Sequence, residues 1–151
     1  MKNNITYKIT EGIPDSFELK QLEGLYKSIF EDAKTDFFLK RIQENEHLCS
    51  IIAFKNKTPI GLKIGYNYNK TTFYSWVGGI LPGHRKQGIA KKLAKLQEQW
   101  AKEHYYSILR TKSMNQFKPM MILNLKNGFN IVNIYTNSQN QTKIVFEKNL
   151  I

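Results

Sequence analysis

The chain has 151 residues, of which 41% are hydrophobic and 13% aromatic; this is enough apolar mass for one folded domain and excludes a disordered polymer. Its net charge of +11, from 23 Lys and Arg against 12 Asp and Glu, favours anionic partners, although most of the lysines are expected on the solvated surface. No apolar run could span a bilayer, no secretory signal follows the first residues, and one cysteine excludes an internal disulfide. We therefore expect a single cytoplasmic domain over residues 1–151, with no membrane partner.

Along the chain, the pattern of residues predicts a series of strands and helices. Strands are predicted from runs rich in β-branched and aromatic residues, and helices from apolar residues that recur on one face. In chain order, the predicted elements are a strand at 5–10, helices at 17–30 and 37–43, strands at 48–54, 59–66 and 71–80, a helix at 88–104, a strand at 106–111, a helix at 118–127, and strands at 129–135 and 143–148. The three consecutive strands indicate an antiparallel meander, in which Cys49 is expected to be a buried small hydrophobe rather than a nucleophile. This order predicts an α/β domain with helices flanking a mixed, mostly antiparallel sheet.

The segment 80–90 contains a loop suited to anions, because it leads from a strand directly into the first turn of a helix. The helix is predicted from four apolar residues on one face, Ile89, Leu93, Leu96 and Trp100. Backbone N–H groups of a first helical turn have no partner within the helix, and the helix dipole adds partial positive charge, so such a turn binds phosphate. Arg85 and Lys86 add full charges beside it.

The spacing in this loop excludes two common phosphate-binding motifs. No Gly-Lys-Ser/Thr follows, as the Walker loop requires, and the first Gly-x-Gly of the dinucleotide fingerprint is missing. Gly88 lets a phosphate approach the backbone and tolerates positive φ, and the small Ala90 leaves room for a bulky ligand. The sequence Arg85-Lys86-Gln87-Gly88-Ile89-Ala90, after Ile80-Leu81-Pro82, resembles the acetyl-coenzyme A loop of the GNAT N-acetyltransferase superfamily. The alternative is a polar loop that only caps an amphipathic helix.

A second block supports the resemblance. Residues 124–129, Asn-Leu-Lys-Asn-Gly-Phe, resemble the end of the family's second conserved block, although an ordinary helix that stops at Asn-Gly would look the same. The order of predicted elements is also that of the GNAT fold, so the resemblance covers essentially the whole chain.

The resemblance implies an acetyl-CoA-dependent N-acetyltransferase without a metal, in which a primary amine of a small molecule or protein attacks the thioester directly. The residues it implies for coenzyme A are Ile80, Leu81, Arg85, Lys86, Gln87, Gly88, Ile89, Ala90 and Asn115. A backbone N–H near Ile80 or Leu81 would polarise the thioester carbonyl, as the end of the strand pairs with pantetheine. Gly78-Gly79 suits a bulge that parts this strand from its neighbour, or else a simple bend.

The groups that move protons depart from the family pattern. Many relatives carry Tyr at the position of Asn124, which can hydrogen-bond the thiol but has no useful pKa. Solvent or one of four tyrosines could supply the proton instead: Tyr26, Tyr66, Tyr68 and Tyr74. The strand at 71–77 has no carboxylate, so a water chain is the expected base, and His84 is interpreted as a loop residue.

Two features are candidates for the acceptor site. Glu31, Asp32 and Asp36 lie between the first two helices, where relatives usually line the acceptor site, and could form an acidic rim or only a solvated turn. Tyr74 and Trp76 could form an aromatic wall, unless one of them is core.

A second function stays open at this point. Because the usual Glu and Tyr are missing, the same fold could be a non-catalytic acyl-CoA-binding module, or could use its basic surface to bind RNA or the ribosome. Nucleic acid is the less favoured partner, and a homodimer through the C-terminal strands is compatible with the sequence.

Overall fold

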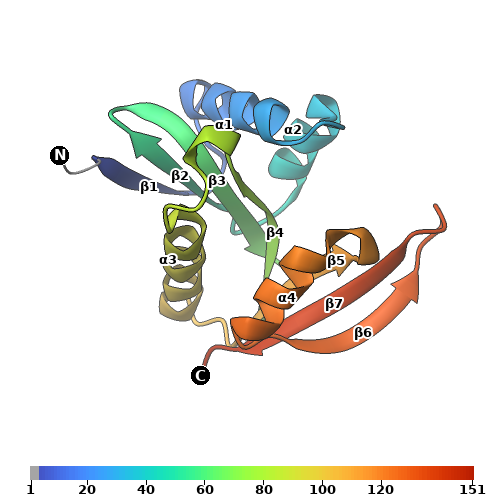
Figure 1. The fold of residues 1–151 in the computed structure, drawn as a ribbon. Helices are drawn as coiled ribbons and strands as arrows, with labels where there is room; N and C mark the ends of the chain where they lie inside the picture. The colour runs from blue at the N-terminus through green and yellow to red at the C-terminus, as the bar shows by residue number, and fades with distance from the viewer. Residues whose placement is uncertain (1–3) are drawn as a thin grey trace.

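The computed structural model describes residues 4–151, and its elements follow the predicted order (Figure 1). The strands are β1 (Ile5–Glu11), β2 (Cys49–Lys55), β3 (Thr58–Asn67), β4 (Thr72–Ile80), β5 (Ile108–Met114), β6 (Asn130–Thr136) and β7 (Thr142–Asn149). The α-helices are α1 (Ser16–Ile29), α2 (Thr35–Glu44), α3 (Ile89–Glu103) and α4 (Lys118–Lys126), and two short 3₁₀ helices are η1 (Pro82–His84) and η2 (Asn115–Phe117). No helix within residues 4–151 is long and apolar enough to cross a membrane.

All seven strands belong to one sheet, in the order β1-β2-β3-β4-β5-β7-β6. The predicted meander is confirmed, because β2, β3 and β4 pair antiparallel. Only β4 and β5 pair in parallel, so the sheet is mixed and mostly antiparallel, as expected. The strand β5 runs past the predicted end at Thr111 to Met114, since β7 pairs with it along its whole length. Polar Lys112 and Ser113 weakened the sequence signal there.

The helices cover both faces of this sheet and divide the core in two (Figure 1). The helix α1 begins where the Asp15 side chain accepts a hydrogen bond from Glu18 N at 2.8 Å, and its apolar side joins α2 over one face. The helix α3 packs on the opposite face, where Leu93 and Trp100 meet Phe73 of β4. Cys49 is fully buried in this second cluster, and burial raises the pKa of its thiol to about 12, which excludes a nucleophilic thiolate at neutral pH.

The strand β4 contains a bulge, but not where the sequence predicts it. The partner register with β3 shifts between Ile64 and Gly65, which pair with Val77 and Ser75, so Trp76 is the extra residue. The predicted bulge at Gly78-Gly79 is therefore wrong, because both glycines keep their partners in β3. Gly79 is required for packing instead, since a Cβ there would lie 2.7 Å from Cγ2 of Ile29 in α1.

Candidate functional site

The strands β4 and β5 part after a short parallel contact. Their pairing covers only Thr72–Tyr74 and Ile108–Arg110, and the last link is a hydrogen bond of 3.1 Å from Thr111 Oγ1 to Ser75 O. Both strands continue beyond this point without pairing with each other. The far edge of β4 therefore presents unpaired backbone groups, to which an extended ligand could add like another strand.

The direction of each backbone N–H and C=O bond determines which of these groups face the open edge of β4. Leu81 N already donates to Ile60 O of β3, at 2.8 Å, so Leu81 does not fit the prediction of a free N–H donor. In an antiparallel pair, successive residues point their N–H and C=O alternately toward and away from the partner. Ile80 and Gly78 therefore face the open edge, while Gly79 faces β3. Of the two predicted donors Ile80 remains, and Gly78 joins it.

The loop after β4 has the shape that its sequence predicts. Gly88 is the N-cap of α3 with φ +79°, and no side chain among the described residues caps this helix end. A Cβ on Gly88 would meet no atom within 4 Å, so the space above it is open. Arg85 Nε donates to Ile80 O at 3.0 Å and ties the loop to the end of β4, while the side chain stays exposed.

The remaining loop residues divide into inward and outward positions. Lys86, Gln87 and Ala90 are exposed beside the open helix end, whereas Ile89 is buried and anchors the first turn in the core. The exposed side chains of this loop thus surround the open helix end, to which Ile89 contributes only backbone. His84 is half-buried in η1, as expected for a loop residue.

The helix α4 turns a polar side chain toward the sheet. Asn124 is the buried residue of this helix, and its apolar neighbours Leu123 and Leu125 are exposed. Asn115 is exposed at the start of η2, directly after the last residue of β5. Phe117 is 48% exposed and belongs to neither core cluster.

Lys63 is a site residue that the sequence analysis missed. It pairs with Gly78 across β3 and β4, and its Cγ and Nζ lie 3.5 and 3.4 Å from the position that a Cβ on Gly78 would occupy. The lysine therefore extends over Gly78, in the space left free by the missing side chain. Burial lowers the pKa of Lys63 to about 8. A charged residue within a mostly apolar strand is the one sequence signal that could have revealed it.

Replacement of Lys63 by methionine is expected to stabilise the protein at pH 7. The pKa of this lysine is 10.5 in the unfolded chain and about 8 in the folded protein. Between about pH 8 and 10.5 the unfolded chain therefore binds more protons, and the free energy of unfolding rises with pH. Below about pH 8 the native state carries the full cost of the buried charge. The side chain keeps part of its hydration, so we expect Lys63→Met to add about 2 kcal/mol to the free energy of unfolding. Urea titrations at pH 7 and 9.5 measure this gain, which should shrink at the higher pH. The exposed Lys70→Met is the control, and an equal gain in both variants contradicts the assignment.

An aromatic cluster lies on the other face of the sheet, below α1 and α2. Tyr74 and Trp76 both contribute to it: Tyr66 lies 5.4 Å from Tyr74 and 6.0 Å from Trp76 between ring centroids, and Phe38 of α2 lies 5.4 Å from Trp76. The side chains of Tyr74 and Trp76 are half-buried and pack against the buried residues on this face. Burial raises the pKa of Tyr66 and raises that of Tyr74 to about 12, so both phenols keep a proton that they can donate.

The acidic residues between α1 and α2 are exposed. Glu31 and Asp32 form the turn after α1, and Asp36 lies in the first turn of α2. No ion pair of the described residues involves them. Across residues 4–151, no three His, Cys, Asp or Glu side chains gather as ligands of a metal ion would.

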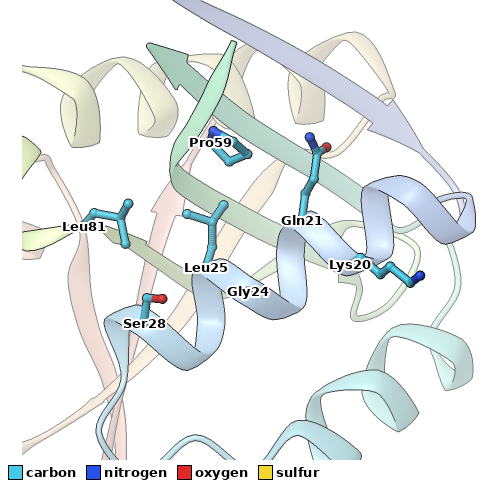
Figure 2. A pocket seen from close by; sticks show the side chains of 7 residues that line it. All are labelled: Lys20, Gln21, Gly24, Leu25, Ser28, Pro59 and Leu81. Atoms are coloured by element: carbon cyan, nitrogen blue, oxygen red, sulfur yellow. The ribbon is translucent and has the colours of Figure 1, made fainter. Parts of the chain in front are cut away.

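Two surface hollows lie away from these groups. Figure 2 shows the first, between α1 and the start of β3, with Leu25, Pro59 and Leu81 as its apolar floor and Lys20, Gln21 and Ser28 at its rim. Leu81 is the one predicted site residue that it touches. The second is lined by the turns before β2 and β4 and by the residues after α3, including His47 and His104, and touches none.

Comparison with protein families decides the assignment. The model of the acetyltransferase (GNAT) family matches residues 17–118, more than half of the sequence. The chain belongs to the GNAT acetyltransferase family. The matched residues run from α1 to the start of α4, and so include the parted strands and the glycine loop. A search of curated proteins finds no match.

Solved structures agree with this fold over nearly the full length. The ribosomal-protein-S18-alanine N-acetyltransferase of Escherichia coli superposes with a TM-score of 0.79 at 12% identity, covering 96% of this chain and 94% of that one. A GNAT family acetyltransferase of Elizabethkingia anophelis with acetyl-CoA bound gives a TM-score of 0.76 at 21% identity, with 98% and 99% covered. A PaiA N-acetyltransferase of Thermoplasma acidophilum in complex with coenzyme A gives 0.71 at 17% identity, with 95% and 99% covered. At these identities the similarity establishes the GNAT fold.

Proposed function

We propose that this GNAT protein transfers an acetyl group from acetyl-CoA to a primary amine, and that residues 1–151 form one N-acetyltransferase domain acting in the cytoplasm. The observation that carries the proposal is the open edge of β4 next to the uncapped N-terminus of α3. An extended pantetheine chain fits the first, and a pyrophosphate fits the second. Two of the similar structures hold acetyl-CoA or coenzyme A.

In this proposal the loop after β4 binds the acetyl donor, acetyl-CoA. Backbone N–H groups from Gln87 to Ala90 bind the pyrophosphate, and Arg85 and Lys86 add charge at the rim. Gly88 keeps the approach open, and Asn115, directly after β5, would contact the phosphates or pantetheine.

The open edge of β4 would then orient the thioester. Ile80 N–H would donate a hydrogen bond to the thioester carbonyl oxygen, which becomes an oxyanion when the neutral amine attacks. A donor of this kind lowers the activation free energy by about 3 kcal/mol. The C–N bond forms, the C–S bond breaks, and the sulfur leaves as a thiolate that takes up a proton. Asn124 lies buried on α4, where its amide can hydrogen-bond the sulfur or pantetheine. A water chain takes the proton from the amine.

Binding and thiol release test this proposal in two steps. Calorimetry is expected to show coenzyme A binding, and a thiol-release assay is expected to show turnover with members of an amine panel. No binding at millimolar coenzyme A contradicts the donor site. Binding without turnover of any amine favours the second function, a non-catalytic acyl-CoA-binding module on this fold, and a gel shift with RNA that survives moderate salt favours a nucleic-acid-binding module.

A homodimer through the C-terminal strands belongs to the same proposal. The strand β6 forms the outer edge of the sheet, and Ile131, Val132 and Ile134 are exposed along it. An apolar, unpaired edge of this kind suits pairing with a second copy.

A further inference from the structure

Arg41 brings a positive charge to the aromatic cluster. It extends from α2, and its guanidinium carbon lies 5.4 Å from the ring centroid of Trp76 and 5.0 Å from that of Phe37. The same charge acts on the phenols of Tyr66 and Tyr74, where it opposes the effect of burial on their pKa values. Arg41 therefore lies over the start of the stretch of β4 that does not pair with β5.

The strand β5 brings two more cations from the other side of the parting. Lys112 Nζ lies 5.8 Å from the ring centroid of Tyr74 and 5.3 Å from that of Tyr135 in β6. Arg110 stacks over Tyr68 at 4.6 Å and pairs with Glu147 Oε2 at 2.8 Å. Tyr74, the last residue of β4 paired with β5, thus has cations from α2 and β5 around it.

The charges in this group do not balance. Glu147 neutralises Arg110, but neither Arg41 nor Lys112 has an ion pair among the described residues. The buried phenols cannot balance them, because their raised pKa values keep them uncharged. Burial removes part of the hydration that stabilises the charges of Arg41 and Lys112. A bound anion would replace this lost stabilisation, so the two cations favour an anionic ligand.

The positions of Arg41 and Lys112 in the fold connect this excess positive charge with the acceptor. Trp76 and Tyr74 belong to the same strand as Ile80, and Lys112 lies in the stretch of β5 that no longer pairs with β4. The two cations therefore stand on either side of the parting, on the face opposite α3, whose N-terminus takes the phosphates in the proposed function. An acceptor that enters from this face meets both cations beside the open edge of β4, where Gly78, two residues from Trp76, offers the nearest free N–H.

We propose that the acceptor is a primary amine that carries a carboxylate within a few bonds, and that Arg41 and Lys112 bind this carboxylate. Two sources share the chemistry, a free amino acid and the N-terminus of a peptide with an acidic residue near its start. Polyamines are poor acceptors, because they bring more positive charge to the same surface. This inference rests on the proposed function.

Matched acceptors test it with the whole protein and acetyl-CoA. One arm compares free amino acids with their carboxamides, and the other compares peptides that carry Asp or Glu at the second position with those that carry Asn or Gln. Rates of thiol release are compared per concentration of neutral amine, so that differences in amine pKa do not enter. In at least one arm, we expect kcat/KM for the carboxylate member to exceed that of its amide by about tenfold or more, as for a hydrogen bond to a charged group. The arm with the preference identifies the source.

Charge-matched variants show whether these two residues cause the preference. Arg41→Met and Lys112→Met are each expected to lower the carboxylate-to-amide ratio about tenfold, with little change for the amide. Lys40→Met removes the same charge from the next position of α2, where the side chain is 72% exposed, and should keep the ratio. Circular dichroism and coenzyme A binding establish that each variant is folded.

Equal rates for both members, a preference for the amide, or a ratio that survives in both variants overturns the inference while the proposed function stands. Bound coenzyme A without turnover of any member overturns it as well. No coenzyme A binding overturns the proposed function itself, and with it the inference.

Discussion

Gly65→Ala is expected to destabilise the protein by about 3 kcal/mol or more, the largest effect of a single methyl group in this chain. A Cβ on Gly65 would lie 2.4 Å from Phe73 Cε2, 2.7 Å from Tyr74 O and 2.9 Å from Gln97 Nε2. The phenyl ring and the amide could move, but the carbonyl belongs to the neighbouring strand of the sheet. The added methyl group therefore has to push β3 from β4 or lift α3 from the sheet, which also disturbs the open edge of β4.

Urea unfolding measures this loss against a glycine that has room. Gly24 lies in the middle of α1 with no atom within 4 Å of the added Cβ, so Gly24→Ala should stabilise the protein by about 0.5–1 kcal/mol through helix propensity. The two variants add the same atom and are expected to move the urea midpoint in opposite directions. Midpoints that move together would contradict the packing at Gly65.

Gly88→Ala is expected to weaken coenzyme A binding about hundredfold with a much smaller effect on folding. Gly88 holds φ +79° at the start of α3, where nothing fills the space above its backbone. A methyl group enters the volume that the pyrophosphate needs and holds it away from the N–H groups, each of which contributes about 1.5–3 kcal/mol when its acceptor is charged.

Gly12 provides a close control for the backbone strain. It has φ +78°, and a Cβ there also meets no atom within 4 Å, but it lies in the turn before α1. Both alanine variants should lose about 1–2 kcal/mol of stability, because a left-handed conformation costs an L-residue that much. Only Gly88→Ala should change the calorimetric affinity for coenzyme A. Equal affinities in the two variants would show that the loop does not hold the phosphates.

The sequence was informative where a feature depends on neighbouring residues. The positive φ of Gly88, the amphipathic α3 and the element order follow from local spacing, and the structure has them. The bulge was misplaced because it arises from how β4 pairs with Gly65, far away in the sequence, and a Gly-Gly pair says nothing about that register. Leu81 was proposed as a donor since nothing local reveals that Ile60 accepts its N–H.

Three other charged residues were missed for the same reason. Arg41, Lys63 and Lys112 come from α2, β3 and β5, and nothing in the sequence of its own segment tells what each of them contacts. Their meaning depends on what the sheet places beside them: Gly78 under Lys63, Trp76 under Arg41, and Tyr74 near Lys112. The donor site is local in sequence and could be predicted, whereas the acceptor side depends on tertiary contacts.

The extra residue at Trp76 also determines how this strand can change in length. Phe73 and Ile80 both pack under α3, although they are an odd number of positions apart and regular alternation would send them to opposite faces. The bulge resets the phase, so that Gly79 meets α1 and Ile80 returns to the α3 side. Deleting one residue at the bulge would leave Phe73 and Ile80 an even number of positions apart, so β4 could pair regularly with β3 and both side chains would stay on the α3 face. A single deletion at the bulge can therefore be accommodated within the strand, whereas a single insertion after it would exchange the two faces and turn the N–H of Ile80 toward β3.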